Sequence, residues 1–305
     1  MYRIKDVLNI LLGFLCILPL YTTLNYDQDL NPDILNYMYD YIYNYGYYEI
    51  GYQYIVLFFR DLLGFNFQSY WNSLLIIEVI LLFLLYKRFS VIIIAYMTLL
   101  IMSQGILGTQ VRYTLSILIF LLSIDFFYDN KKILYTGFLL SFLLHIGSGF
   151  IIIIFLCSRK ISMSALSKHK YFFCFLCLVI IFFSKVVVLY AMQYTRFIYF
   201  DKGSVFLQSR SVISIIYMFI SAIFIYKGIV INKCFENNVI IKLSLFLLII
   251  SLLCSSIAVL SARIFVVYML IIPLVTYYFI YNSKTRILGL GLLSLSIVNL
   301  IVYFL

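Results

Sequence analysis

The sequence predicts an all-α, polytopic integral membrane protein, and its composition, mean hydropathy and repeated apolar runs all support this fold class. Hydrophobic residues make up 65% of the 305 residues, charged residues make up 11%, and the mean hydropathy is +1.08. A soluble core needs far less apolar sequence, whereas one membrane span needs roughly 20 apolar residues. We therefore expect about ten transmembrane helices in a single transmembrane domain covering residues 1–305.

The charge balance narrows the class of partner. The chain carries 22 Lys and Arg against 12 Asp and Glu, which gives a net charge of +10. In a soluble protein this balance would indicate nucleic-acid binding, but in a membrane protein it reflects the accumulation of Lys and Arg in cytoplasmic loops. We therefore expect the lipid bilayer as the surrounding partner, and no nucleic acid.

The cysteines do not indicate a metal site. Six are present, and they form no disulfide pattern. Cys174 and Cys177 make a C-x-x-C inside an apolar run without a second ligand pair nearby, whereas structural zinc sites use four ligands. We interpret these two residues as packed or lipid-facing thiols, and we expect neither a metal nor a cofactor.

The N-terminal segment is interpreted as a retained first span. The apolar run at residues 7–24 follows Arg3 and Lys5 and lacks a small-residue cleavage site. Basic residues before a first span favour a cytoplasmic N-terminus. Residues 25–50, which are rich in tyrosine and acidic residues, then form an outer segment.

Residues 50–68 predict an amphipathic helix on the outer surface. Ile50, Tyr54 and Phe58 recur at helical spacing, and the same stretch includes the charged pair Arg60 and Asp61. An apolar stripe beside charged residues is typical of a helix that lies in the membrane interface and does not cross the bilayer.

The next three apolar runs alternate across the membrane. Residues 72–86 return to Lys87 and Arg88 on the cytoplasmic side, residues 89–107 cross outward, and residues 113–128 come back to further basic residues. This order satisfies the positive-inside rule.

Residues 133–158 predict a broken-helix hairpin. A single crossing would place Arg159 and the basic residues after it outside, and it would invert every later loop. Two short helices that turn within "LLHIGSG", residues 143–149, avoid this inversion, and Gly147 and Gly149 relieve the backbone there. Such broken helices occur where they line a cavity or pack within protein.

The second half continues the alternation. The expected spans are residues 171–193 outward, 212–227 inward, 239–260 outward, 265–281 inward and 287–305 outward.

This topology leaves mostly arginines among the basic residues on the outer side. They are Arg60, Arg112, Arg196, Lys202, Arg210 and Arg263. A guanidinium is a planar, permanently charged fork that suits phosphate oxygens. Each arginine could instead snorkel to lipid headgroups or pair with an outer aspartate, and we favour this alternative for Arg60 and Lys202. Arg112 and Arg263 are expected in very short outer connections, which favours a functional role.

His145 is one of two histidines in the chain. A lone histidine among apolar residues is usually a packed, hydrogen-bonded group. The predicted hairpin places His145 near the outer leaflet and level with the arginines, where an imidazole suits acid–base chemistry or phosphate binding.

Three stretches of the first half carry a family resemblance. They are "YYEIGYQYIVLFFRDLLG" (47–64), "GTQVRYTLSILIFLLSI" (108–124) and "KKILYTGFLLSFLLHIGSGFIII" (131–153). In order and spacing they resemble the EpsG-like branch of the Wzy polysaccharide polymerases: an acidic residue before Gly-Tyr, an arginine that opens a span, and a histidine followed by small residues. The second half contributes "SARIFVVYMLIIP" (261–273).

The resemblance implies a metal-independent glycosyltransferase of the bacterial inner membrane that acts on its outer, periplasmic face. The implied donor is a growing glycan on undecaprenyl diphosphate, which is transferred as a block to a single lipid-linked repeat unit. Undecaprenyl diphosphate is the leaving group. A chain-length regulator is a possible further partner.

The resemblance also suggests roles for individual residues. Guanidinium groups would stabilise the leaving diphosphate, and the candidates are Arg112, Arg196, Arg210 and Arg263. A carboxylate or imidazole would accept the proton of the acceptor hydroxyl, and Glu49 and His145 compete for this role. The sugar-binding candidates are Tyr52, Asp40 and Gln110. The acidic residues of the outer segment are expected to form a sugar-facing or merely solvated surface, and they are Asp27, Asp29, Asp33 and Asp40.

Two other function classes remain open. A lipid-linked oligosaccharide flippase would also place arginines around a cavity, although we find no inverted repeat in the hydropathy. A membrane acyltransferase that modifies surface glycans would also use a membrane histidine and arginine, but its cofactor would enter from the cytoplasm.

Overall fold

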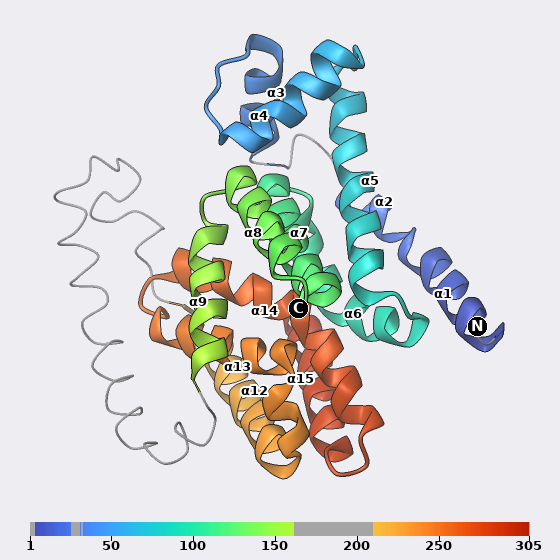
Figure 1. Cartoon of the computed structure of the whole chain (residues 1–305), viewed down its shortest axis with the longest axis vertical. Coiled ribbons are helices and arrows are strands. Elements are labelled where there is room, and N and C mark those ends of the chain that lie inside the picture. The colour runs from blue at the N-terminus through green and yellow to red at the C-terminus, as the bar shows by residue number, and fades with distance from the viewer. Residues whose placement is uncertain (1–3, 26–30, 32, 162–209, 305) are drawn as a thin grey trace. The chain divides into compact units, whose positions relative to one another are not determined.

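A computed structural model of the chain describes residues 4–25, 31, 33–161 and 210–304 (Figure 1). All regular elements within these ranges are helical, and no strand occurs among them. This confirms the all-α fold class. The chain divides into two compact units, residues 1–153 and 154–305. That they act as one transmembrane domain stays a prediction.

The first unit is organised around the long helix α5 (Phe67–Tyr86). It packs against α1 (Ile4–Ile17), α2 (Leu20–Leu24), α6 (Phe89–Met102) and α7 (Val111–Phe127). The aromatic side chains of α5 form much of the core, because its tyrosine and tryptophan rings are at most 2% exposed.

A second group of elements positions the segment that the sequence predicts on the outer side. Helix α7 packs along α8 (Lys131–Leu144), and α8 also contacts α4 (Ile50–Leu57). Helix α3 (Ile34–Tyr43) and the π-helical turn η2 (Phe58–Leu62) both contact α5. A second π-helical turn, η3 (Ser103–Leu107), extends α6 toward the start of α7.

The second unit contains a closed ring of four helices. They are α12 (Val212–Ile231), α13 (Val239–Leu253), α14 (Ala258–Tyr281) and α15 (Arg286–Phe304), and each packs against the next, with α15 returning to α12. The short 3₁₀ helix η6 (Lys233–Asn237) joins α12 to α13. Helix α9 (Ser148–Lys160) runs from the first unit into the second.

Short polar side chains define where several of these helices begin. The side chain of Asn66 accepts a hydrogen bond from the backbone N–H of Ser69 at the start of α5. Asn130 caps α8, Ser211 caps α12 and Asn238 caps α13 in the same way. Each cap satisfies N–H groups that the first helical turn leaves without partners, so the apolar runs start at defined residues.

The described helices confirm a polytopic membrane protein. Five segments are long and apolar enough to cross a bilayer: α1 and α2 taken together, α5, α12, α14 and α15. Helices α6 and α13 are apolar but shorter. The predicted span at 171–193 lies outside the described residues.

The predicted boundary between two late spans was wrong. Helix α13 ends at Leu253 and α14 already begins at Ala258, whereas the sequence predicted spans at 239–260 and 265–281. Arg263 therefore lies inside α14 and not in a connection. A single arginine near a helix end does not interrupt the helix, because its long side chain can carry the charge to the surface.

The predicted outer helix is shorter than expected. Helix α4 and η2 together cover 50–62, and α5 has begun by Phe67. Gly64 separates them with a φ of +66°, a conformation that favours glycine. The exposed face of the outer helix is apolar, with Ile50 60%, Tyr54 66% and Leu62 72% exposed, as an interfacial helix requires.

The predicted break in 133–158 is present. Helix α8 ends at Leu144, and α9 starts at Ser148. Three residues turn the chain between them, with the N–H of Ser148 donating to the carbonyl of His145 at 3.0 Å. The sequence therefore located this interruption correctly, while the side of the membrane on which α9 ends stays a prediction.

Cysteine labelling would test that sidedness. In a cysteine-free background, Asp129→Cys before α8 and Ile161→Cys after α9 are both expected to resist a membrane-impermeant maleimide in intact cells, because a hairpin returns to its starting side. Both should react after permeabilisation. Asn44→Cys, at an exposed position of the segment predicted on the outer side, serves as the accessible control. Labelling of Ile161→Cys from outside would show a single crossing.

Paired serines join neighbouring helices in both units. The Ser116 hydroxyl on α7 donates to the carbonyl of Ser141 on α8 at 2.8 Å. On α13 and α14, Ser251 and Ser261 each donate to the other's carbonyl, at 2.9 and 2.8 Å. Small polar residues of this kind allow close helix packing in a membrane. We call these two contacts the serine clasps.

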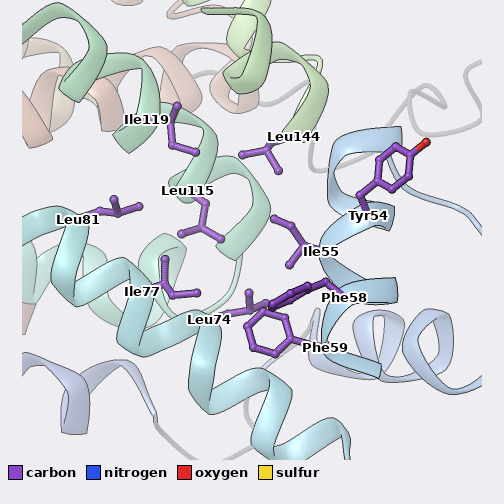
Figure 2. Close-up of a pocket in the computed structure, with 10 residues that line it drawn as sticks. All are labelled: Tyr54, Ile55, Phe58, Phe59, Leu74, Ile77, Leu81, Leu115, Ile119 and Leu144. Carbon is purple, nitrogen blue, oxygen red and sulfur yellow. The ribbon is translucent and has the colours of Figure 1, made fainter. Parts of the chain in front are cut away.

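An apolar cavity of 350 Å³ lies within the first unit, between α4 with η2, α5, α7 and the end of α8 (Figure 2). It borders the elements that carry the candidate functional residues.

Candidate functional site

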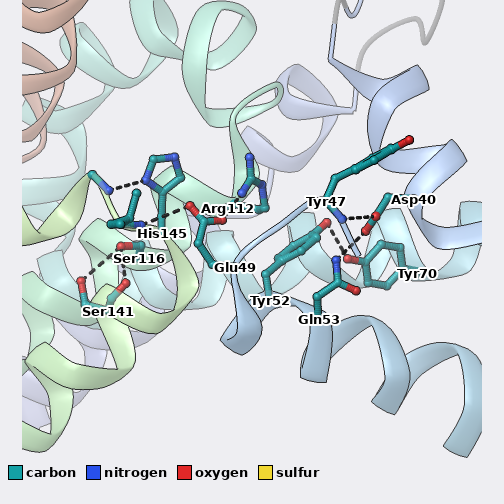
Figure 3. A network of polar contacts seen from close by, with 12 residues as sticks. Asp40, Tyr47, Glu49, Tyr52, Gln53, Tyr70, Arg112, Ser116, Ser141 and His145 are labelled. Atoms are coloured by element: carbon teal, nitrogen blue, oxygen red, sulfur yellow. Dashed lines mark hydrogen bonds and ion pairs between the residues drawn. The ribbon is translucent and has the colours of Figure 1, made fainter. Parts of the chain in front are cut away.

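Three segments that are far apart in the sequence meet in the first unit and bring Glu49, Arg112 and His145 together (Figure 3). Glu49 immediately precedes α4, Arg112 lies in the first turn of α7, and His145 ends α8. All three had been predicted as site residues. Their assembly rests on Glu49, because its two carboxylate oxygens reach the other two segments.

Glu49 occupies the N-cap position of α4, but its side chain does not cap that helix. One oxygen, Oε2, forms an ion pair with the Arg112 guanidinium. The other, Oε1, accepts a hydrogen bond from the backbone N–H of Ile146 at 3.2 Å. Glu49 therefore links α4, α7 and the turn between α8 and α9.

Arg112 lies in a partly buried aromatic enclosure. Its guanidinium lies 3.7 Å from the ring centroid of Tyr48, with Tyr37 at 5.7 Å and Tyr52 at 5.6 Å. The negative face of an aromatic ring attracts a cation, and the attraction strengthens when water is excluded. The enclosure and the ion pair together hold the guanidinium in one place.

The phenols of this enclosure are neutral. Burial raises the pKa of Tyr37, although the nearby Arg112 charge opposes the shift. Burial also raises the pKa of Tyr48, and again Arg112 opposes it. Both groups therefore act as neutral aromatic surfaces, and neither supplies a negative charge to neutralise Arg112.

Two buried donors at the site lack a hydrogen-bond partner among the described residues. They are Nε of Arg112 and the hydroxyl of Ser148, the first residue of α9. An unsatisfied buried donor costs about 1–3 kcal/mol. A bound oxygen acceptor would remove this cost, so the arrangement suits a ligand rich in oxygen.

His145 is oriented by its own turn. Its Nδ1 accepts the backbone N–H of Gly147 at 2.9 Å, and its ring packs edge-on against Tyr113 with centroids 5.2 Å apart. Because Nδ1 acts as an acceptor, the neutral imidazole carries its proton on Nε2. His145 therefore presents an N–H donor at Nε2.

Gly51 permits the close approach of α4 to α8. A Cβ at this position would lie 2.8 Å from both the carbonyl carbon and the carbonyl oxygen of Leu143, and the backbone of α8 cannot move aside easily. Gly51→Ala is therefore expected to push α4 outward and to destabilise the protein by about 1–3 kcal/mol, as overpacking does. The thermal unfolding midpoint in detergent measures this effect.

Gly105→Ala is the matched control, because a Cβ there meets no atom within 4 Å. This variant is expected to keep the wild-type midpoint. Equal midpoints for the two alanine variants would contradict the close-approach argument.

The sugar-binding candidates lie mostly inside the unit. Asp40 is 1% exposed, and its carboxylate accepts from the N–H of Tyr47 at 3.1 Å and from Nε2 of Gln53 at 2.9 Å. The solvated alternative is therefore wrong for Asp40, while its role in sugar binding stays a prediction. Tyr52 is 1% exposed and accepts the hydroxyl of Tyr70 at 2.6 Å. Gln110 is half-buried at the N-cap of α7.

The other predicted arginines fall elsewhere. Arg196 lies outside the described residues. Arg210 belongs to the second unit, where its guanidinium lies 4.9 Å from the Phe265 ring and its backbone N–H donates to the carbonyl of Ser255 at 2.9 Å. Arg263 is exposed on α14, two residues before Phe265. Two of the predicted arginines therefore lie near the start of α14: Arg263 on the helix itself, and Arg210 against its Phe265.

Burial also shifts the pKa of Arg210. It lowers the pKa of this guanidinium to about 10, which still leaves it protonated at neutral pH. Its Nε is a further buried donor without a hydrogen-bond partner among the described residues.

The sequence did not identify several residues of the site. Three of them were not candidates. Tyr37 contributes an aromatic ring beside Arg112, Gly51 allows the close approach of α4 to α8, and Ser148 contributes a buried hydroxyl donor. Tyr48 and Tyr52 flank Glu49 on either side, so their spacing was a usable signal. Tyr37 had no such signal in the sequence. It is one of 29 tyrosines, and the residues around it do not indicate a contact with α7.

Within the described ranges, no group of three or more His, Cys, Asp or Glu side chains is placed to hold a metal ion. The C-x-x-C at Cys174 and Cys177 lies outside those ranges.

Comparison with known proteins gives one result. A model of the EpsG family matches residues 9–305, which is nearly the whole chain and includes every segment of the site. No curated protein and no solved structure matches the chain.

Proposed function

Because this chain belongs to the EpsG family, we propose that it polymerises lipid-linked oligosaccharide repeat units into a surface polysaccharide. Family membership and the apolar helices make it a multi-pass membrane protein of polysaccharide polymerase type. The finer proposal is a metal-independent glycosyltransferase of the bacterial inner membrane, with its N-terminus in the cytoplasm and its site on the outer face.

One observation carries this proposal: the buried Nε–H of Arg112 has no acceptor among the described residues, while Nη1 of the same guanidinium is held by Glu49. A guanidinium presents five N–H donors in a fixed plane. A diphosphate oxygen would satisfy the buried Nε–H, and charge-assisted bonds to phosphate are among the strongest hydrogen bonds in proteins.

The proposed reaction is a displacement at an anomeric carbon. A hydroxyl of the acceptor repeat unit attacks the anomeric carbon of the growing glycan, and a new C–O bond forms. The bond from that carbon to the diphosphate breaks, and undecaprenyl diphosphate leaves with the electron pair. The proton of the attacking hydroxyl passes to a base of the protein.

The geometry favours Glu49 over His145 as that base. Each Glu49 oxygen already has one partner, Arg112 or the N–H of Ile146, but a carboxylate oxygen can accept a further hydrogen bond. The Nδ1 of neutral His145 is the single acceptor of that ring, and a backbone N–H already occupies it. His145 then offers Nε2–H to an oxygen of the departing diphosphate. Arg112 and His145 would together stabilise the charge that develops on the leaving group. Arg210 and Arg263 are further diphosphate candidates in the second unit.

The product that accumulates in cells lacking this chain tests the proposal. We expect single repeat units on undecaprenyl diphosphate at the outer face and no long glycan. Retention of these units at the cytoplasmic face would indicate a flippase, and long chains that lack an acyl substituent would indicate an acyltransferase. Either outcome would overturn the polymerase proposal.

A further inference from the structure

The apolar cavity beside the site has walls suited to a hydrocarbon chain. Ten side chains from four segments line it (Figure 2), namely Tyr54, Ile55, Phe58, Phe59, Leu74, Ile77, Leu81, Leu115, Ile119 and Leu144. The single side-chain polar atom among them, the hydroxyl of Tyr54, points away from the other labelled side chains in Figure 2. A ligand in this cavity therefore meets only carbon atoms of these side chains.

The cavity shares helices α7 and α8 with the charged cluster. Leu115 and Ile119 follow Arg112 by three and seven residues on α7, so all three lie on one face of that helix. At the α-helical rise they lie about 4.5 and 10.5 Å from Arg112 along the helix axis. Leu144 immediately precedes His145. The apolar walls thus begin about one turn along α7 from the backbone of Arg112.

The cavity has a closed floor and an open side. Leu74, Leu115 and Leu144 are 0%, 2% and 6% exposed, whereas Tyr54 and Phe58 on the rim are 66% and 48% exposed. A chain longer than the cavity can therefore enter from the side and continue outward past the rim. The volume of 350 Å³ falls within the range of about 300–1,000 Å³ typical of ligand sites.

We propose that this cavity holds the first isoprene units of a polyprenyl diphosphate whose diphosphate binds at Arg112. The inference rests on the proposed function and deepens it. In a prenyl diphosphate the first isoprene unit is bonded directly to a phosphate oxygen, so its hydrocarbon must start beside the guanidinium. A glycerophospholipid instead places an ester-bearing glycerol between phosphate and hydrocarbon, and this polar linker does not suit carbon-lined walls that begin one turn away.

Two neighbouring isoleucines of α5 provide a matched pair of variants. Ile77 lines the cavity, whereas Ile76 does not, and they are 36% and 48% exposed. Ile77→Trp would fill the cavity from its open side, and Ile76→Trp adds the same ring outside it. We expect Ile77→Trp to raise the KM for undecaprenyl-diphosphate-linked repeat units about tenfold, as lost burial of two methylene groups would. Ile76→Trp should stay within about twofold.

A substrate with a truncated prenyl chain extends this comparison. Its KM should already be high with the wild-type protein, and Ile77→Trp should raise it less than it raises the KM of the full-length substrate. Equal KM values for the two tryptophan variants would overturn the cavity assignment. If the wild-type protein condenses no repeat units in the same assay, the proposed function itself fails.

Photolabelling tests occupancy without requiring activity or a variant that folds. A benzophenone-bearing farnesyl diphosphate without glycan is added to the wild-type protein in vesicles of phosphatidylethanolamine. We expect labelled peptides from α4, α5 and α7, and loss of labelling with excess farnesyl diphosphate but not with added phosphatidylglycerol. Equal competition by phosphatidylglycerol, or labelling of other segments, would show that the cavity takes bulk lipid and would overturn the proposal.

Discussion

Replacement of Arg112 by lysine is expected to abolish long glycan chains almost as completely as replacement by alanine. Lysine keeps the charge, but it loses the planar fork that pairs with Glu49 on one side and offers a buried N–H on the other. Charge-assisted hydrogen bonds of this kind contribute roughly 1.5–3 kcal/mol each. Loss of one or two of them should slow transfer by about ten- to ten-thousand-fold.

Glycan ladders from membranes with matched protein amounts measure this effect. Arg60→Lys is the control, because Arg60 pairs with the exposed Asp61 and donates to the carbonyl of Tyr41, and exposed ion pairs contribute little. Near-normal ladders from Arg112→Lys would rule out diphosphate binding by the fork and would leave Arg112 as a snorkelling residue.

Replacement of Glu49 by glutamine is expected to produce the second large loss. Glutamine keeps a similar shape and one acceptor oxygen, but it cannot accept the proton of the attacking hydroxyl. Removal of a positioned general base typically costs about 10²–10⁴ in rate. The initial rate of glycan transfer by the purified protein in vesicles measures the loss.

Glu49→Gln also removes the ion pair with Arg112. Loss of one partner of a partly buried ion pair destabilises the protein, so a lower rate could reflect lower stability. The exchange Glu49→Arg with Arg112→Glu separates the two effects. It restores opposite charges between α4 and α7, so we expect near wild-type protein levels but no long glycan. If the exchange restored polymerisation, the pair would be a structural link and Glu49 would not be the base.

The sequence was informative wherever a local pattern determines the structure. Hydropathy located the helices, and the small residues after His145 located the interruption between α8 and α9. The sequence also singled out Glu49, Arg112 and His145, and the structure brings these three residues together, while their roles stay predictions. These residues interrupt otherwise apolar runs, and polar groups in such positions need partners that a membrane does not supply.

The sequence was less informative about contacts between distant segments. Asp40 carries a charge in a tyrosine-rich outer segment, so a solvated position was expected, yet Tyr47 and Gln53 satisfy it inside the unit. Tyr37 reaches Arg112 across 75 residues of chain, and no local pattern encodes that contact. Arg263 was taken to mark a helix boundary because it is charged, although a helix tolerates one arginine near its end.

The serine clasp of the first unit has a consequence for biogenesis. It joins α7 and α8 through residues only 25 apart, so it can close as soon as α8 enters the bilayer during synthesis. This early pair already carries Arg112 and His145. Glu49 is synthesised 63 residues before Arg112, so it stays in the membrane interface until α7 and α8 have paired. We therefore expect the docking of α4 to be the late step of insertion and the step most exposed to quality control.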